Sequence, residues 1–113
     1  MRTALAALAL VVAAGGAQAG EELNEGWWIV AGSFRQSGAD RNDASIAKAS
    51  SGLKRCGFKP FNDFSDKFAG FAPGFDVVVT GPYTEHAEAD AIVARVRRCV
   101  PSAYVKSARY LGE

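Results

Sequence analysis

Hydrophobic positions in the first half of the chain follow two different periods. Residues Trp27–Phe34, WWIVAGSF, form a run of aromatic and β-branched residues with a glycine near its end, which predicts a strand. Residues Asn42–Gly57 place apolar side chains three or four positions apart, which predicts a helix with Asn42 or Asp43 as N-cap and Gly57 as C-cap. The first half is therefore predicted to be a strand followed by a helix.

The second half of the chain repeats this plan. Residues Phe75–Tyr83, FDVVVTGPY, predict a strand, and Thr84 then caps a helix that extends to Cys99. Acidic residues lie in the first turn of this helix and arginines in its last turn, as the helix dipole favours. Residues Ala103–Tyr110 alternate as a closing strand, and Phe58–Phe64 is the remaining candidate for the strand that closes the first half.

Together these segments give the order strand, helix, strand, strand, helix, strand. The order predicts an α+β domain with a ferredoxin-like βαββαβ fold, in which an antiparallel four-stranded sheet carries two helices on one face. Strand alternation directs Ile29, Ala31 and Val78 toward the helices. The side chains expected on the opposite, open face are Trp28, Val30, Val77, Val79, Tyr104 and Lys106.

Six of the seven phenylalanines lie between Phe58 and Phe75, spaced three or four residues apart. A continuous helix is not expected there, because two prolines and two glycines interrupt the stretch and oppose helical geometry. Two arrangements remain. In the first, the rings form a lid across an edge or the open face of the sheet and bury apolar area at about 25 cal/mol per Å². In the second, they stand exposed as a platform for sugar rings. A mixture of the two, with most rings buried and Asn62, Asp63 and Lys67 at the rim, also stays open.

The N-terminal residues resemble an export signal. Residues 1–19 contain one basic residue, Arg2, an apolar run and an Ala17-Gln18-Ala19 cleavage pattern, which together predict a signal peptide. The apolar run is shorter than the roughly 20 residues that a membrane-spanning helix needs, so no membrane span is expected in the mature chain. We expect residues 20–26 to be a short polar lead, residues 27–113 to form one domain, and the mature protein to be periplasmic or secreted.

The expected mature chain has no charge excess. The sequence contains 13 Lys and Arg against 12 Asp and Glu, and Arg2 is the only charged residue in the predicted signal peptide. Acidic and basic residues are then equal in number. This balance gives no support to nucleic acid or an anionic membrane as the partner.

Two short motifs stand at corresponding places in the two halves. Gly32-Ser33-Phe34 and Gly81-Pro82-Tyr83 each end a predicted strand and precede a helix with an alanine-rich face. In this arrangement the chain resembles the SPOR domain, the sporulation-related repeat of bacterial envelope proteins, from about Trp27 to Tyr110. The resemblance implies a ferredoxin-like fold and a non-catalytic module that binds peptidoglycan, with a preference for glycan strands stripped of their stem peptides, and a link to the division septum.

In that family, glycan binding is associated with the sheet face that the helices leave open. The predicted facing suggests stacking contacts from Trp28 and Tyr104, and hydrogen bonds to sugar hydroxyls from Ser33, Asn62 and Lys106. The family often carries a glutamine and a polar or basic residue where this chain has Val30 and Val79. The expected face is therefore apolar, so either it binds a ligand or another part of the chain covers it.

The two cysteines support opposite conclusions. Export favours a disulfide between Cys56 and Cys99, which would contribute roughly 4 kcal/mol by closing a long loop. Topology opposes it, because antiparallel helices would separate two C-terminal cysteines by about 20 Å. A disulfide tolerates only about 7 Å between Cα atoms, so the bond is left open at this point.

No catalytic residue, metal site or cofactor is expected. Two cysteines and one histidine are too few for a structural zinc site, and His86 is expected at the surface. The sequence has no nucleophile elbow, phosphate loop or HExxH motif. Paired carboxylates for glycan hydrolysis would have to come from Asp63, Asp66 and Asp76, which are expected to serve turns instead.

Three functions follow from these expectations. The first is a non-catalytic module that binds peptidoglycan glycan strands, in cell division or envelope maintenance. The alternative is an interaction module that kept the fold, lost glycan binding and pairs with an envelope protein or a second copy. An enzyme acting on cell-wall glycan ranks last, because no catalytic motif supports it.

Overall fold

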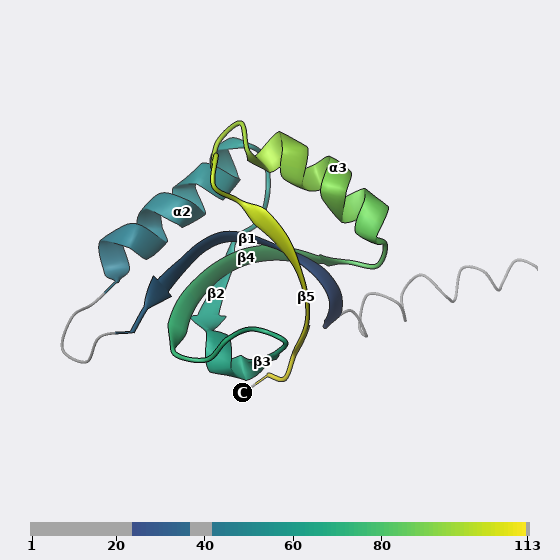
Figure 1. The fold of residues 1–113 in the computed structure, drawn as a ribbon. Coiled ribbons are helices and arrows are strands. Elements are labelled where there is room, and N and C mark those ends of the chain that lie inside the picture. The colour runs from purple at the N-terminus through teal and green to yellow at the C-terminus, as the bar shows by residue number, and fades with distance from the viewer. Residues whose placement is uncertain (1–23, 37–41, 113) are drawn as a thin grey trace, which may run out of the picture.

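The computed structural model describes residues 24–36 and 42–112, which form an α+β fold (Figure 1). The predicted signal peptide and most of the polar lead lie outside these residues. The elements in chain order are β1 (Glu25–Arg35), α2 (Asp43–Arg55), β2 (Phe61–Phe64), the 3₁₀ turn η2 (Ser65–Lys67), β3 (Phe68–Ala69), β4 (Phe75–Tyr83), α3 (His86–Val96) and β5 (Tyr104–Tyr110). Within the described ranges, no helix combines the length and hydropathy needed to cross a membrane.

Local sequence explains where the first helix ends. The backbone N–H of Gly57 donates to Lys54 and that of Phe58 donates to Leu53, the paired bonds of a Schellman cap. Gly57 has a φ of +88°, which this cap requires at the residue after the C-cap. Phe58 is part of this helix cap. The following strand therefore begins at Phe61, and not at Phe58 as predicted.

The sheet has five strands where the sequence predicted four. Its order is β2-β4-β1-β5-β3, and every neighbouring pair is antiparallel. The additional strand is β3, which comes from the phenylalanine-rich stretch and pairs with β5 through Phe68 and Ala69. The prediction missed it because a two-residue strand leaves no alternation to detect.

The sheet is strongly curled, as Figure 1 shows. Strands β2 and β3 form its two opposite edges, yet only the three residues of η2 separate them in the chain. Four peptide steps span at most roughly 15 Å, whereas the edges of a flat five-stranded sheet lie about 19 Å apart. The short connection therefore requires the two edges to approach each other.

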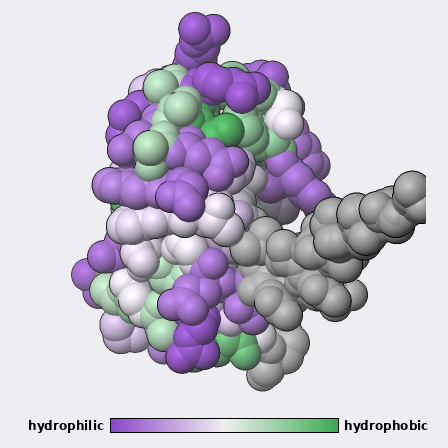
Figure 2. Space-filling model, turned by 90° about the vertical axis from the view of Figure 1, so that its right-hand side faces the viewer, coloured by the Kyte–Doolittle hydropathy of each residue, from purple (hydrophilic) through white to green (hydrophobic). Residues whose placement is uncertain are grey.

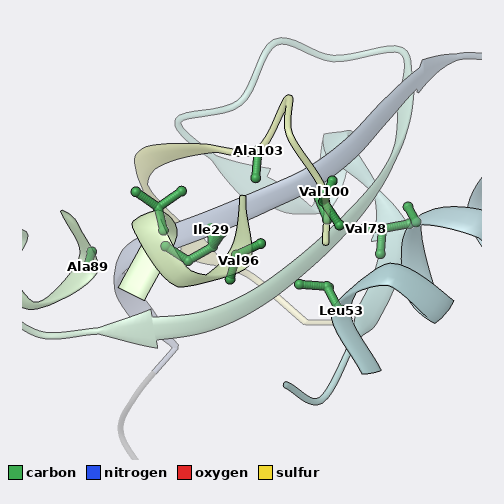
Figure 3. Packing of buried hydrophobic residues seen from close by; sticks show 10 residues of the cluster. Ile29, Leu53, Val78, Ala89, Val96, Val100 and Ala103 are labelled. Carbon is green, nitrogen blue, oxygen red and sulfur yellow. The ribbon is translucent and has the colours of Figure 1, made fainter. Parts of the chain in front are cut away.

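The curl creates two cores, one on each face of the sheet. The larger core lies between the sheet and the helices and includes Ile29, Leu53, Val78 and Val96, all fully buried (Figure 3). The second core fills the inside of the curl. Its members are Trp28, Val30, Phe68, Val77, Val79 and Ala108.

Cys56 and Cys99 form a disulfide, with their Cα atoms 6.0 Å apart. The topological objection to this bond was wrong, because it assumed that the helices lie side by side. In Figure 1, α2 and α3 run from opposite sides of the molecule toward each other, so their C-terminal ends meet. Cys99 also lies beyond the end of α3, in a turn where the N–H groups of Cys99 and Val100 donate to Val96. A helix length therefore does not separate the two cysteines.

Candidate functional site

The predicted facing of the central strands is confirmed, but the expected open face is covered. Trp28, Val30, Val77 and Val79 lie on the side away from the helices, and each is at most 4% exposed. The indole N–H of Trp28 donates to the carbonyl of Ala108 at 3.0 Å. Trp28 is therefore fixed inside the second core, where its ring is not available for stacking on a sugar.

The cover comes from the phenylalanine-rich stretch. Phe68 is 3% exposed, meets Trp28 edge to face and stacks on Phe71 with ring centroids 4.6 Å apart. Phe61 and Phe64, in contrast, are 38% and 50% exposed. The stretch is thus a lid at Phe68, while two of its rings face solvent at the edge of the sheet.

A small cleft of about 190 Å³ remains beside this lid. Its floor is formed by Val30 and Val77. Ser33, Tyr104 and Lys106 line it as well, so the structure brings together three of the five residues predicted to bind glycan. Tyr104 is 43% exposed, and Ser33 and Lys106 are exposed too, which leaves their polar atoms accessible to a ligand.

A β-bulge directs Ser33 into the cleft. Ser33 lies three positions after Val30 in the strand, so strict alternation would place it on the opposite face, toward the helices. The pairing of β1 with β4 shifts register between Val30 and Gly32, so Ser33 lies opposite Val77 and shares its face. Gly32 takes the helix side instead, where a Cβ atom would lie only 2.6 Å from the ring of Phe34.

Asn62 does not join the cleft. In the pairing of β2 with β4 it lies opposite Val78, a residue of the larger core between sheet and helices. Opposed residues in an antiparallel pair share a face. Asn62 is therefore exposed on the other side of the sheet, and its predicted contact with a ligand of this cleft is not supported.

Two aromatic residues of the cleft, Phe71 and Phe75, were absent from the predicted contacts. They are placed by a turn that side chains hold closed: the carboxylate of Asp66 accepts the N–H of Gly74, and the hydroxyl of Ser65 accepts the N–H of Phe75. The sequence indicated these two residues only as members of the six-phenylalanine stretch. The stretch alone could not show which rings turn inward, because that depends on hydrogen bonds between residues eight and ten positions apart.

The carboxylates considered for hydrolysis have other partners. Asp63 accepts a hydrogen bond from the hydroxyl of Tyr110 at 2.6 Å. Asp76 accepts one from the side-chain amide of Asn42 at 2.8 Å, and Asp66 holds the turn at Gly74. Each carboxylate therefore takes part in a contact that organises the fold.

His86 lies at the surface near the start of α3. Its ring stacks on Trp27 with centroids 4.1 Å apart, and its Nε2 lies 3.4 Å from a carboxylate oxygen of Asp90. Among the described residues, no group of three or more His, Cys, Asp or Glu side chains has an arrangement that could hold a metal ion.

The cleft has the chemistry of a site for a hydroxyl-bearing ring. Phe71 and Tyr104 offer aromatic surface, while the ammonium group of Lys106 and the hydroxyls of Ser33 and Tyr104 offer hydrogen-bond donors. The part of its lining that the structure describes contains no carboxylate. Its volume lies below the roughly 300–1,000 Å³ of drug-sized sites, so it would accommodate one ring rather than a chain.

Comparison with known proteins gives no family: no protein-family model, curated protein or solved structure matches the chain.

Proposed function

We propose that the protein is a non-catalytic peptidoglycan-binding module of the bacterial envelope, related to the SPOR domain. The ferredoxin-like βαββαβ plan is supported by the order of β1, α2, β2, β4, α3 and β5, with β3 as an insertion between the second and third strands. The glycine motifs of the two halves, at Gly32 and Gly81, support the same relationship.

The observation that carries this proposal is the cleft containing Ser33, Tyr104 and Lys106. The sequence predicts glycan contacts for these three residues. They line one accessible cleft and have aromatic surface beside them. Because Trp28 is buried under Phe68, the proposed mode is local: one sugar ring enters the cleft beside the lid, instead of a strand lying along the whole sheet face.

The disulfide supports the proposed compartment. Disulfides persist in oxidising environments such as the periplasm and are rare in the reducing cytosol. The bond between Cys56 and Cys99 therefore fits the periplasmic or secreted location expected from residues 1–19.

Co-sedimentation with purified peptidoglycan tests the proposal. Mature protein is mixed with intact wall and with wall whose stem peptides an amidase has removed, and bound and free fractions are measured. We expect tighter binding to stripped wall, with no release of soluble fragments over the incubation. No binding of a folded protein to either wall, or release of fragments, would contradict the proposed function.

Matched variants test the cleft itself. Tyr104→Ala removes an exposed ring inside the cleft, and Phe64→Ala removes an exposed ring outside it. Lys106→Ala and Lys59→Ala form a second pair, because Lys59 lies away from the cleft. We expect each cleft variant to weaken binding about five- to tenfold and each control to leave it unchanged. Equal effects within the pairs would place the contact elsewhere.

The alternative, an interaction module, is favoured by a different observation. Phe61 and Phe64 expose their rings on β2, which forms one end of the sheet. Exposed aromatic side chains beside a sheet edge are common in protein contacts. Sedimentation velocity over a range of concentrations tests pairing with a second copy. An increase of the sedimentation coefficient with concentration that Phe64→Lys abolishes would support pairing. A monomer at every concentration would contradict it.

A further inference from the structure

Charge is unevenly distributed in the fold, although the expected mature chain is balanced. From Ala44 to Asn62 and from Ala91 to Gly112, the sequence contains nine Lys and Arg and no Asp or Glu. Acidic side chains lie in the first turn of each helix and basic ones in its last turn. Because the C-terminal ends of α2 and α3 meet at the disulfide, the basic residues of the two last turns, Lys54, Arg55 and Arg95, lie at the same end of the molecule (Figure 1).

A cavity of about 400 Å³ opens at this end, between α2, the end of β1 and the turn after α3. It lies on the helix side of the sheet, whereas the proposed glycan cleft lies on the opposite side. Its apolar wall includes Phe34, Ala49 and Val100. Lys48 and Arg55 supply positive charge, and none of the described residues that line it is an Asp or Glu.

The charged groups are arranged for an anion. The guanidinium of Arg55 donates to the carbonyl of Cys99 at 3.2 Å, which holds its side chain against the cavity wall and leaves further N–H donors available. Among the described residues, no carboxylate forms an ion pair with Lys48 or Arg55. Ser45 and Ser102 add two hydroxyls to the lining.

Basic residues at helix C-termini also complement the helix dipole, and that role alone would require no ligand. The position of Lys48 distinguishes a ligand site from this dipole role. Lys48 lies in the middle of α2, away from the last turn, yet it lines the same cavity as Arg55. Apolar walls together with two cations in one cavity are typical of sites that bind an ionised group attached to a small apolar group.

We propose that this cavity binds a small organic anion, a carboxylate or a phosphate ester that carries a compact apolar group. The apolar group would lie against Phe34 and Val100, and the oxyanion would accept hydrogen bonds from Lys48 and Arg55. The two cations bind either oxyanion, and the disulfide at Cys99 fixes the turn that forms one wall.

Nuclear magnetic resonance titration of the mature, oxidised protein tests this proposal. The probes are benzoate, phenyl phosphate and benzamide, the last being a neutral analogue of benzoate. We expect benzoate or phenyl phosphate to shift the amide signals of α2 and of residues 99–102, and benzamide to bind at least about fivefold more weakly. The tighter of the two anions then identifies the oxyanion class. Equal binding of benzamide and benzoate, or no shift with either anion, would overturn the proposal.

Two variants and a control complete the test. Lys48→Gln removes an exposed charge from the cavity lining and should weaken binding of the anion about five- to tenfold. Ser45→Tyr fills the cavity from the exposed surface of α2 and should abolish the shifts. Lys106→Gln, in the cleft on the other face, should leave them unchanged. A loss that is equal for Lys48→Gln and Lys106→Gln would rule out this cavity. Peptidoglycan binding can fail without affecting this result, because the described linings of the two sites have no residue in common.

Discussion

The rings of Trp28 and Phe68 meet edge to face, with centroids 5.2 Å apart and planes at 89°. This contact joins the central strand of the sheet to the strand at its far edge, and both rings are nearly inaccessible to solvent. A tryptophan on a sheet face free of helices is converted from a surface for ligands into the centre of a second core.

Replacement of Phe68 should open that core. We expect Phe68→Ala to lower the free energy of unfolding by about 3–5 kcal/mol, because it removes a buried aromatic ring and leaves a cavity. Urea denaturation measures the loss. In a Trp27→Phe background, Trp28 is the only tryptophan, and acrylamide quenching of its fluorescence should increase.

Phe64→Ala is the control for Phe68→Ala, because that ring is 50% exposed. We expect it to change stability by less than about 0.5 kcal/mol and to leave quenching unchanged. Similar effects of the two substitutions would show that Phe68 does not cover Trp28.

Loss of the disulfide should destabilise the domain without changing its topology. We expect Cys56→Ser combined with Cys99→Ser to lower the free energy of unfolding by about 4 kcal/mol, because the unfolded chain regains the freedom of a long loop. Chemical denaturation of both proteins measures this. Mass spectrometry of a non-reduced digest should recover the Cys56 and Cys99 peptides joined, and two free thiols in oxidised protein would contradict the pairing.

Gly70 should tolerate a side chain less well than Gly57 does. Both have positive φ angles, +118° and +88°, so alanine is strained at either position by about 1 kcal/mol. A Cβ atom at Gly70 would also lie 2.8 Å from the carbonyl oxygen of Ser107, while Gly57 has open space. We expect Gly70→Ala to cost at least about 1 kcal/mol more than Gly57→Ala in urea denaturation. Equal costs would indicate that β5 yields to the new atom.

Tyr83 should make stability depend on pH in the alkaline range. Burial raises the pKa of Tyr83 above its ordinary value of 10.0, although a side-chain hydrogen bond with Thr80 acts in the opposite direction. The folded state therefore favours the neutral phenol. The stabilisation that the neutral phenol gives the folded state is complete below pH 10 and is lost as the pH rises through the pKa of Tyr83 in the folded state. Urea denaturation at increasing pH should show a smaller alkaline loss for Tyr83→Phe, and identical losses would exclude this linkage.

The surface on the side of α3 bears on the choice between the proposed functions. Figure 2 shows mainly hydrophilic side chains there, with apolar ones in small separate groups. That view has no broad apolar surface of the kind that permanent assemblies bury. On the side of α3, the view therefore gives no support to a permanent apolar interface.

The sequence by itself determined most of the elements and the direction of most side chains. The strand Phe75–Tyr83 has the predicted bounds, and the alternation of Trp28, Ile29, Val30 and Ala31 between the two faces is as predicted. Helix α3 begins at His86 and ends at Val96, inside the predicted range, because Glu85 remains extended and the chain tightens into turns before Cys99. These features follow from local periodicity, which needs no knowledge of distant residues.

Only the tertiary structure decided the curl, the disulfide and the composition of the cleft. The curl depends on β3 pairing with β5 across the sheet, and the disulfide depends on where two helices end relative to each other. Ser33 enters the cleft through a bulge, and Trp28 is removed from it by Phe68, a residue 40 positions away in the chain. Each of these outcomes is set by contacts between segments far apart in the sequence, and the period of a single segment carries no information about its partner.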